Sequence, residues 1–221
     1  MKALDLFCGA GGASMGLHLA GFEVVGVDIK RQAEYPFTAV WADATSPILD
    51  EIGWLKTFDL IWASPPCQAF TAYKRRKDHV KPRENLIPIV RKKLRASGVP
   101  YIIENVGGAP LENPVMLCGS MFGLDVQRHR YFETSFPVAQ PKCDHSEWTP
   151  RFKSATNRAN LRKTVEVGVW RIPLKVQQDA MGIDWMKLPE LSQAIPPAYS
   201  EYLANQFKGW QALLSESGGE K

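Results

Sequence analysis

The stretch LDLFCGAGGASMGL, residues 4–17, decides the fold that this sequence predicts. The apolar segment Ala3–Phe7 is expected to form a strand, and Gly12–Ala20 is expected to form a helix. Glycine permits a tight turn between them and a close approach of the backbone to a ligand, while the helix N-terminus offers free N–H donors. A glycine cluster alone also occurs in ordinary turns, so the surrounding sequence has to separate the two interpretations. The glycines concerned are Gly9, Gly11, Gly12 and Gly16.

Strand and helix signals alternate after this turn. Apolar segments predict strands at Phe22–Asp28, Ala39–Ala44, Phe58–Ser64 and Val99–Val106, with an amphipathic helix between the last two. This alternation is typical of an α/β fold with a Rossmann-like, doubly wound and mostly parallel sheet. The main domain is expected over 1–136. Residues 137–175 lack periodicity and predict a small inserted lobe, after which 176–221 returns to the main domain.

Composition excludes several classes of protein. The 221 residues are 45% hydrophobic and 23% charged, as in a globular protein, and no apolar run approaches the length of about 18 residues that crosses a bilayer. The four cysteines are scattered without CxxC spacing, which indicates reduced thiols and a cytoplasmic location rather than a disulfide framework. A net charge of +4 weakly favours a polyanionic partner. The positive charge is concentrated in two runs, KRRKDHVKPR (74–83) and RKKLR (91–95).

Two acidic residues follow neighbouring predicted strands. Asp28 ends the second strand and Asp43 follows the third, so both are expected at the carboxyl edge of the sheet. Ligands of open α/β sheets bind at that edge, and a carboxylate there can accept hydrogen bonds from a ribose diol. The glycine turn and the two acids therefore predict an adenosine-containing cofactor. No GKS or GKT P-loop is present in the sequence, which disfavours a nucleoside triphosphate.

A cysteine and a glutamate follow the next two strands. In SPPCQ (64–68) two prolines stiffen the turn before Cys67, and the polar and cationic residues after it are poor core material. A buried cysteine that acts as a small hydrophobe is the structural alternative. Glu104 ends the fifth strand and is either an edge residue in solvent or a desolvated acid with a raised pKa. A thiol nucleophile beside a protonated carboxyl suits addition to an electron-poor ring.

Five motifs occur in the order known from one enzyme family. They are DLFCGAGGASMG, PPCQ, ENV, QRHRYF and AIPPAYSEYLANQ. In this order the sequence resembles the DNA cytosine-5 methyltransferases, and five ordered matches at the ends of predicted strands are much more specific than one. The resemblance implies an S-adenosyl-L-methionine-dependent enzyme of the class I methyltransferase fold that methylates DNA. It also makes 1–136 the catalytic and cofactor-binding domain and 137–175 the target-recognition lobe.

The resemblance also assigns roles to individual residues. It implies that Cys67 attacks C6 of a cytosine flipped out of the duplex while Glu104 binds N3, so that C5 accepts the methyl group. Arg130 is expected to contact the base, with Arg128 supporting the site and Asn105 helping to position Glu104 or the catalytic loop. Gln68 completes the set of predicted catalytic residues. The predicted S-adenosyl-L-methionine-binding residues are Phe7, Gly9, Ala10, Gly11, Gly12, Asp28, Ile29, Asp43, Ala44 and Pro65.

Duplex DNA is the expected partner of a monomeric chain in a bacterial or phage-infected cell, with an accessory protein as an option for target recognition. The predicted nucleic-acid contacts are Thr71, Lys74, Arg75, Arg76, Lys77, Arg151, Arg158 and Arg162. Two alternatives stay open. The form PPCQAFT resembles the branch of the family that methylates transfer RNA, and a non-catalytic regulatory homologue would keep the fold without the reaction.

The chain departs from the family pattern in a few places. Val126 stands where the family has a Gln before the paired arginines, Gln127 follows it, and Ser192–Gln193 replaces a Gly-Asn pair. The recognition region is short for the family. The segment CDHSEW (143–148) offers only two soft ligands at irregular spacing, which favours a polar loop, so no metal site is expected.

Overall fold

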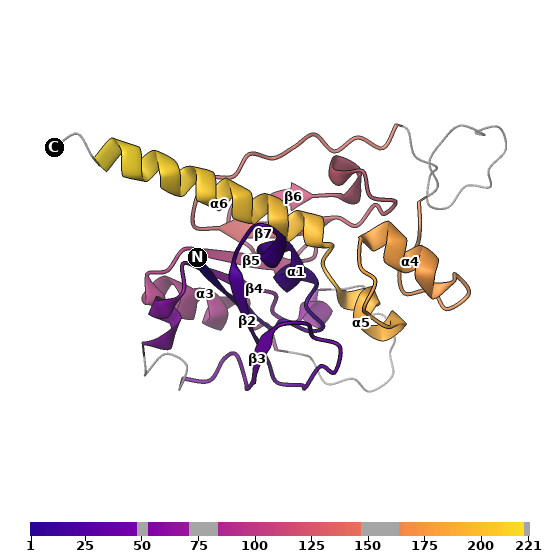
Figure 1. The fold of residues 1–221 in the computed structure, drawn as a ribbon, viewed down its shortest axis with the longest axis horizontal. Coiled ribbons are helices and arrows are strands. Elements are labelled where there is room, and N and C mark those ends of the chain that lie inside the picture. Colours follow the sequence, from indigo (N-terminus) through magenta and orange to yellow (C-terminus); the bar gives the residue numbers. More distant parts are fainter. Residues whose placement is uncertain (48–52, 71–83, 147–163, 219–221) are drawn as a thin grey trace.

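The computed structural model describes residues 1–47, 53–70, 84–146 and 164–218. One sheet of seven strands, in the order β3-β2-β1-β4-β5-β7-β6, forms the middle of the molecule (Figure 1). Strands β1 to β5 run parallel to one another, and β7 pairs antiparallel with both β5 and β6. The Rossmann-like α/β fold predicted from the sequence is confirmed. The strands are β1 (Lys2–Leu6), β2 (Glu23–Asp28), β3 (Thr38–Trp41), β4 (Leu60–Ala63), β5 (Tyr101–Asn105), β6 (Val115–Leu117) and β7 (Arg130–Thr134).

The strand order changes direction at β1, which lies between β2 and β4 inside the sheet. The chain first moves outward through β2 and β3 and then continues on the other side of β1 with β4 and β5. The loops after β1 and β4 therefore leave the sheet in opposite directions, and in open α/β sheets such a reversal is where a ligand-binding crevice is expected, at the carboxyl ends of the strands. The sequence places the glycine turn, Asp28, Cys67 and Glu104 at or just beyond these ends.

Helices cover both faces of the sheet. Helices α1 (Gly12–Leu19) and α6 (Pro197–Gly218) pack on one face, where α6 crosses the sheet beside α1 (Figure 1). Helix α3 (Ile87–Ser97) packs on the other face through an apolar stripe typical of an amphipathic helix. None of the helices in the described ranges has the length and hydropathy that a membrane span needs.

Helices α1 and α6 touch at a glycine. A Cβ atom at Gly16 would lie 2.0 Å from the carbonyl oxygen of Pro197 and 2.1 Å from Oγ of Ser200, so only glycine fits between the two backbones. Tyr199 and Phe207 of α6 are fully buried in the same apolar cluster as Leu17 of α1. Helix α1, which follows the glycine turn, is thus fixed against a helix from a distant part of the sequence.

Two short helices connect β7 to α6 in the described part of the chain. They are α4 (Leu174–Met181) and α5 (Leu188–Gln193), and they bury Met181 and Leu191 in a third apolar cluster that also contains Ala10 of the glycine turn. Between them, Nε1 of Trp185 donates a hydrogen bond of 2.8 Å to the carbonyl of Ala10. The later part of the chain therefore supports the turn from outside the sheet.

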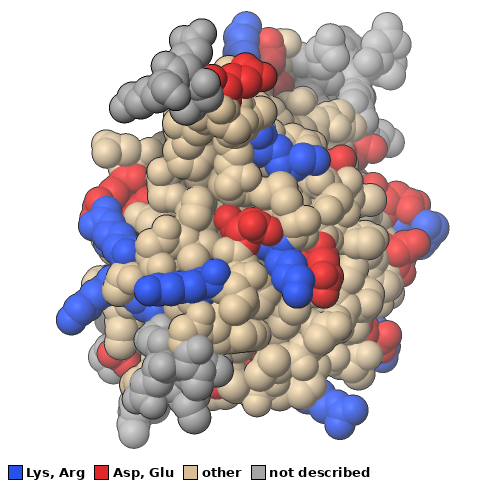
Figure 2. All heavy atoms as spheres, turned by 60° about the vertical axis from the view of Figure 1, so that its left-hand side comes forward, with Lys and Arg blue, Asp and Glu red and all other residues tan. Residues whose placement is uncertain are grey.

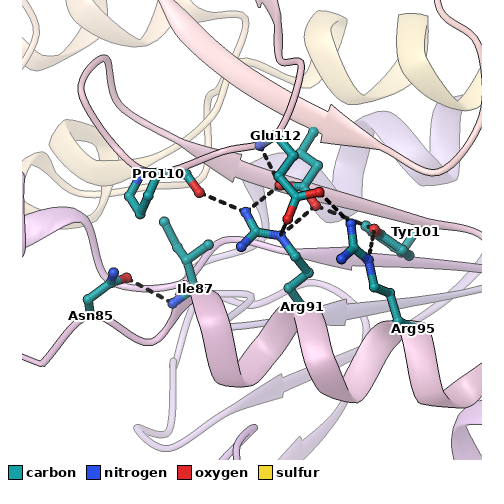
Figure 3. Close-up of polar contacts among 8 residues, drawn as sticks. Asn85, Ile87, Arg91, Arg95, Tyr101, Pro110 and Glu112 are labelled. Carbon is teal, nitrogen blue, oxygen red and sulfur yellow. Dashed lines mark hydrogen bonds and ion pairs between the residues drawn. The ribbon is translucent and has the colours of Figure 1, made fainter.

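A buried ion pair joins α3 to β7. Arg91 donates from Nε to Oε1 of Glu133 at 2.8 Å and from Nη2 to Oε2 at 2.6 Å, and Glu133 is 2% exposed. The same guanidinium donates to the carbonyl of Pro110, while Arg95 reaches Glu112 at the surface (Figure 3). These contacts attach the loop between β5 and β6 to helix α3.

Candidate active site

The turn after β1 has a left-handed backbone at three positions. Phe7 has a φ of 62°, and Gly9 and Gly11 have φ values of 51° and 89°. For a bulky residue such as Phe7 this conformation is rare, and it is held in place by the surrounding structure. A Cβ atom at Gly9 would meet nothing within 4 Å, which shows open space beside this part of the turn. The predicted glycine turn is therefore a strained loop that faces a free volume.

Asp28 at the end of β2 is positioned by the same turn. Its Oδ2 accepts a hydrogen bond of 2.9 Å from the N–H of Gly9, and its Oδ1 accepts one of 2.8 Å from the N–H of Lys30. Each carboxylate oxygen has two lone pairs, so further acceptor capacity remains. The next residue, Ile29, is apolar and yet 70% exposed. A carboxylate next to an exposed apolar side chain fits a ligand that has both a diol and a flat ring.

The loop after β3 brings a second acid to this edge. Asp43 accepts hydrogen bonds from the N–H and the Oγ1 of Thr45, and these hold the pKa of Asp43 below its ordinary value. On the other side of the loop, Nζ of Lys93 donates to the carbonyls of Ala44 and Ser46 at 3.1 and 2.7 Å. Lys93 lies on α3 and was not among the predicted site residues.

A buried acid lies beneath the turn. Asp5 in β1 accepts a hydrogen bond from Oγ of Ser14, and that hydroxyl also contacts the hydroxyl of Tyr35. Burial raises the pKa of Asp5 to about 7, with a smaller contribution from the charge of Asp28. Sequence reasoning missed Asp5, although an acid inside the otherwise apolar segment of Ala3–Phe7 was a visible signal.

The predicted nucleophile begins a short helix after β4. Cys67 is the first residue of the 3-10 helix Cys67–Ala69, which follows the two prolines. Asn105 is fully buried at the end of β5 and donates from Nδ2 to the carbonyl of Pro65 at 2.9 Å. This bond links the carboxyl ends of two neighbouring strands. It constrains the path of the backbone that leads into Cys67.

Glu104 and Arg130 meet at the same edge. Oε1 of Glu104 lies 3.3 Å from Nε of Arg130, and Glu104 is 6% exposed. Burial raises the pKa of Glu104 above its ordinary value, although the nearby guanidinium of Arg130 and a hydrogen bond from Ser64 oppose this effect. Ser64 directly follows β4 and was not predicted as a site residue. Glu104 is therefore a desolvated acid rather than a solvent-exposed edge residue.

The thiol of Cys67 is affected by the same charges. Burial raises the pKa of Cys67, the charge of Glu104 adds to this rise, and the charge of Arg130 opposes it. Cys67, Glu104 and Asn105 all lie at the carboxyl ends of the adjacent strands β4 and β5. Gln68 is adjacent, and its buried Oε1 has no hydrogen-bond partner among the described residues. An unpaired buried acceptor beside the thiol indicates a place where a ligand can donate a hydrogen bond.

Arg128 supports this neighbourhood from the side of α5 and α6. Its Nη2 donates to the carbonyl of Ser192 at 2.6 Å, and its own carbonyl accepts a hydrogen bond of 2.7 Å from Tyr199. Burial lowers the pKa of Arg128 to about 9, and the charge of Arg130 adds to this effect. Ser192, at a position where the sequence departs from the expected pattern, thus contributes its backbone carbonyl to the site.

Comparison with known proteins identifies the family. The family model described as C-5 cytosine-specific DNA methylase matches residues 1–114, which is more than half of the chain. This chain belongs to that family. The family that the sequence motifs indicated is therefore confirmed, and with it the expected class of chemistry, cytosine-5 methylation of DNA.

Curated relatives of this methylase come from bacterial modification systems. The type II methyltransferase M.HgiGI of Herpetosiphon aurantiacus is 35% identical over 122 residues, which cover 50% of this chain and 94% of that sequence. M.HgiDI of the same organism is 32% identical over 131 residues, or 56% of this chain and 42% of the relative. The chain thus spans less than half the length of the second relative.

Solved structures that resemble this methylase confirm the fold. A prophage-encoded protein of E. coli, described as a candidate DNA modification methyltransferase, has a TM-score of 0.64 at 16% identity and covers 96% of this chain and 99% of its own. Dnmt2 methyltransferase of S. pombe has a TM-score of 0.57 at 13% identity and covers 95% of this chain and 98% of its own. At such identities the likeness concerns the arrangement of the strands and helices alone.

The described part of this methylase contains every predicted catalytic and cofactor-binding residue, and all of them lie in or beside the loops at the carboxyl ends of the strands. Their individual roles stay predictions. The predicted nucleic-acid contacts lie outside the described residues, and they are Thr71, Lys74, Arg75, Arg76, Lys77, Arg151, Arg158 and Arg162.

Proposed function

We propose that this chain transfers a methyl group from S-adenosyl-L-methionine to C5 of cytosine in DNA, with Cys67 as nucleophile and Glu104 as acid. One observation carries the proposal. The desolvated carboxyl of Glu104 lies 3.3 Å from the guanidinium of Arg130 at the edge where the Cys67 helix leaves the sheet. A thiol, an acid and a cation gathered at the crevice of a methylase fold suit addition to a cytosine ring.

The residues at the ends of β1, β2 and β3 fit the cofactor. The open space beside Gly9, the acceptor capacity of Asp28 and the exposed apolar side chain of Ile29 suit the amino-acid part, the ribose and the adenine respectively. Phe7 and Asp43 would hold the adenine ring and its amino group. When bound, S-adenosyl-L-methionine supplies an electrophilic methyl group on a sulfonium. The chain's part is to hold this group at the crevice next to Cys67.

The catalytic side chains activate the base. Cys67 gives up its proton to water, and the thiolate forms a bond to C6 of the flipped cytosine. The π electrons of the C5=C6 bond shift towards C4, and N3 takes the proton of Glu104. A raised pKa keeps Glu104 protonated closer to neutral pH, which is the form this step needs. The resulting enamine is nucleophilic at C5.

Release of the product reverses these steps. After C5 has been methylated, N3 returns its proton to Glu104, water takes the C5 proton, and the electrons of the C5–H bond re-form the C5=C6 bond and expel the thiolate of Cys67. Arg130, beside Glu104, is placed to stabilise the charge on the carboxylate while the proton is on the base. Arg128 holds the loop that carries Arg130 against Ser192.

DNA is expected to approach the crevice at the carboxyl ends of the strands. On the face shown in Figure 2, the visible Lys and Arg residues are interspersed with Asp and Glu over a mostly uncharged surface. A nucleic-acid surface instead carries a continuous positive patch. The basic residues at 74–77 follow the Cys67 segment in sequence, so phosphate contacts by this run would lie near the base that reacts.

The test is methyl transfer from labelled S-adenosyl-L-methionine to duplex DNA and to total RNA in parallel, for the wild type and Cys67→Ala. Digestion and mass spectrometry of the product identify the modified base. We expect 5-methylcytosine in DNA with the wild type and none with the variant. Label found only in RNA would assign the chain to the RNA-methylating alternative, and absence of label in both substrates would overturn the proposal.

The covalent step is tested separately with duplex DNA that contains 5-fluorocytosine. Fluorine at C5 cannot leave as a proton does, so the thiolate cannot be expelled after methyl transfer. We expect a complex of wild-type protein and DNA that survives denaturing electrophoresis, and none with Cys67→Ala. Methyl transfer to ordinary cytosine without a trapped complex on 5-fluorocytosine would show that the reaction does not pass through Cys67.

A further inference from the structure

A group of two cysteines and two histidines lies outside the catalytic neighbourhood. The ligand-type atoms of these four side chains all lie within 4.8 Å of one another. We call the group the thiol–imidazole cluster. It consists of Cys118, His129, Cys143 and His145.

The fold brings the cluster together from distant parts of the sequence. Strands β6 and β7 form an antiparallel pair in which Leu117 lies opposite Arg130. Cys118 follows directly after the first of these residues and His129 directly precedes the second, so the two ligands face each other across the pair. Cys143 and His145 come from the segment after β7, on alternate positions of a chain without regular secondary structure.

The distances within the cluster suit a tetrahedral metal. Sγ of Cys118 lies 3.1 Å from Nε2 of His145, and Sγ of Cys143 lies 3.2 Å from the same nitrogen and 3.5 Å from Nε2 of His129. Zn–S bonds of about 2.3 Å and Zn–N bonds of about 2.0–2.1 Å would place sulfur and nitrogen about 3.5 Å apart on a tetrahedron. The two imidazole rings are stacked, with centroids 5.2 Å apart and planes at 11°, and both present Nε2 to the sulfurs.

The surroundings of the cluster also suit a metal with thiolate ligands. Oγ of Ser120 lies 3.4 Å from Sγ of Cys118 and 3.8 Å from Sγ of Cys143, so one hydroxyl can support both sulfurs. The nearby carboxylate of Asp144 is engaged elsewhere, with Lys142 and the N–H of Ser146. The donor set is therefore two sulfurs and two nitrogens, which selects zinc over the oxygen-preferring cations.

We propose that the thiol–imidazole cluster binds one structural Zn²⁺ ion. Four protein ligands close the coordination shell, and two thiolates balance the charge of the ion, as in structural rather than catalytic zinc sites. No metal was expected here from the sequence, because CDHSEW by itself offers only two soft ligands. The pairing of β6 with β7 supplies the other two.

The position of the cluster gives the ion a role. His129 lies between Arg128 and Arg130, and its carbonyl accepts a hydrogen bond of 2.8 Å from Nη1 of Arg130. Cys143 and His145 lie just before residue 147, where the segment expected to recognise the target continues. The ion would thus fasten the beginning of that segment to the strand whose first residue, Arg130, contacts Glu104.

Metal content is the direct test. The protein carrying a tag without histidine is purified without added metal, dialysed against a weak chelator and analysed by inductively coupled plasma mass spectrometry. We expect about one zinc per chain in the wild type and at least about tenfold less in Cys143→Ser and His145→Ala. Cys67→Ala and His18→Ala are matched controls and should retain the zinc of the wild type.

Cobalt substitution keeps the test independent of variants that fail to fold. Wild-type protein is stripped of metal under reducing conditions and titrated with Co²⁺. We expect the intense visible bands and the sulfur-to-metal charge transfer of tetrahedral cobalt with thiolate ligands, and displacement of both by one equivalent of zinc. A wild-type protein that neither contains zinc nor takes up cobalt overturns the proposal.

Two other outcomes also overturn it. The first is a disulfide between Cys118 and Cys143, seen as a mass lower by two hydrogens without reductant. The second is zinc that remains bound in the variants of Cys143 and His145, which would place it elsewhere. None of these measurements depends on methyl transfer. Zinc bound by a protein without activity would therefore leave this inference intact while the proposed function failed.

Discussion

Replacing Arg91 by methionine tests how well the ion pair between α3 and β7 is shielded from water. The change keeps the aliphatic stem of the side chain but removes the cation that donates twice to Glu133. Glu133 would keep the N–H of Glu112 at 2.8 Å and the distant hydroxyl of Tyr101 at 3.4 Å. A buried carboxylate would thus lose its counter-ion and its two strongest hydrogen bonds.

The expected loss of stability follows from this burial. Removal of one partner of a buried ion pair costs about 3–5 kcal/mol. Because the side chain of Arg91 is still 12% exposed, we expect the lower end of this range. In a chain of this size each kcal/mol lowers Tm by about 2–4 °C, so Arg91→Met should melt about 6–12 °C below the wild type.

The control lies one helical turn away. Arg95 pairs with Glu112 at the surface, where the two side chains are 54% and 50% exposed. Arg95→Met should therefore cost less than about 1 kcal/mol. Urea denaturation and thermal melting followed by circular dichroism give both values. A loss of stability in Arg91→Met no larger than in Arg95→Met would refute the argument, because it would show that water reaches Glu133 freely.

The pH dependence of Arg91→Met gives a second readout. Burial alone would raise the pKa of Glu133, but the hydrogen bonds from Arg91 and from the N–H of Glu112 hold it below the ordinary value of 4.5. A depressed pKa stabilises the wild type above pH 4.5, and this contribution is lost as the pH falls through the folded-state pKa. In the variant we expect burial to raise the pKa of Glu133 above its ordinary value, so that the ionised carboxylate lowers stability at neutral pH. The stability difference should be largest near neutral pH and should narrow in acid.

Three further changes test the site. Glu104→Gln removes a carboxyl group whose ionised form raises the pKa of Cys67, so iodoacetamide should alkylate the Cys67 peptide faster near neutral pH, as measured by mass spectrometry, while methyl transfer falls by about 10²–10⁴-fold. Slower alkylation would contradict the electrostatics described above. Gly16→Ala brings a Cβ to 2.0 Å from a carbonyl oxygen of α6, and we expect a loss of about 3 kcal/mol in urea denaturation. Asp28→Ala should weaken S-adenosyl-L-methionine binding in calorimetry by about 10–100-fold, and unchanged affinity would remove Asp28 from the cofactor site.

Much of the fold could be predicted from the sequence because its parallel strands are buried on both faces and read as apolar runs. The predicted helix Gly12–Ala20 agrees with α1, which ends one residue earlier. The predicted strand Ala39–Ala44 starts and ends earlier, as Thr38–Trp41. This strand lies at the edge of the sheet and is largely exposed, so its hydrophobic pattern marks its ends poorly.

Site residues at the ends of strands could be predicted from the sequence. Site residues that come together only through pairing of distant segments could not. The resemblance and the strand pattern together located Cys67 and Glu104. No local pattern indicated that Lys93 would hold the loop of Asp43, because that contact depends on how α3 packs. The thiol–imidazole cluster could not be predicted from the spacing of the cysteines either. Cys118 and His129 are brought together by the antiparallel pairing of β6 and β7 and not by a short sequence motif.

The contact between Gly16 and α6 has a consequence for how the protein is made. A ribosome synthesises the glycine turn and α1 early and α6 after the other described elements, so the side of α1 that packs on α6 has no partner until nearly the whole described chain has emerged. Leu17 shares its apolar cluster with Tyr199 and Phe207, so its burial is complete only when α6 has docked. Folding during synthesis therefore cannot finish domain by domain from the N-terminus. Until α6 docks, the nascent chain exposes an apolar face that chaperones recognise and that favours aggregation.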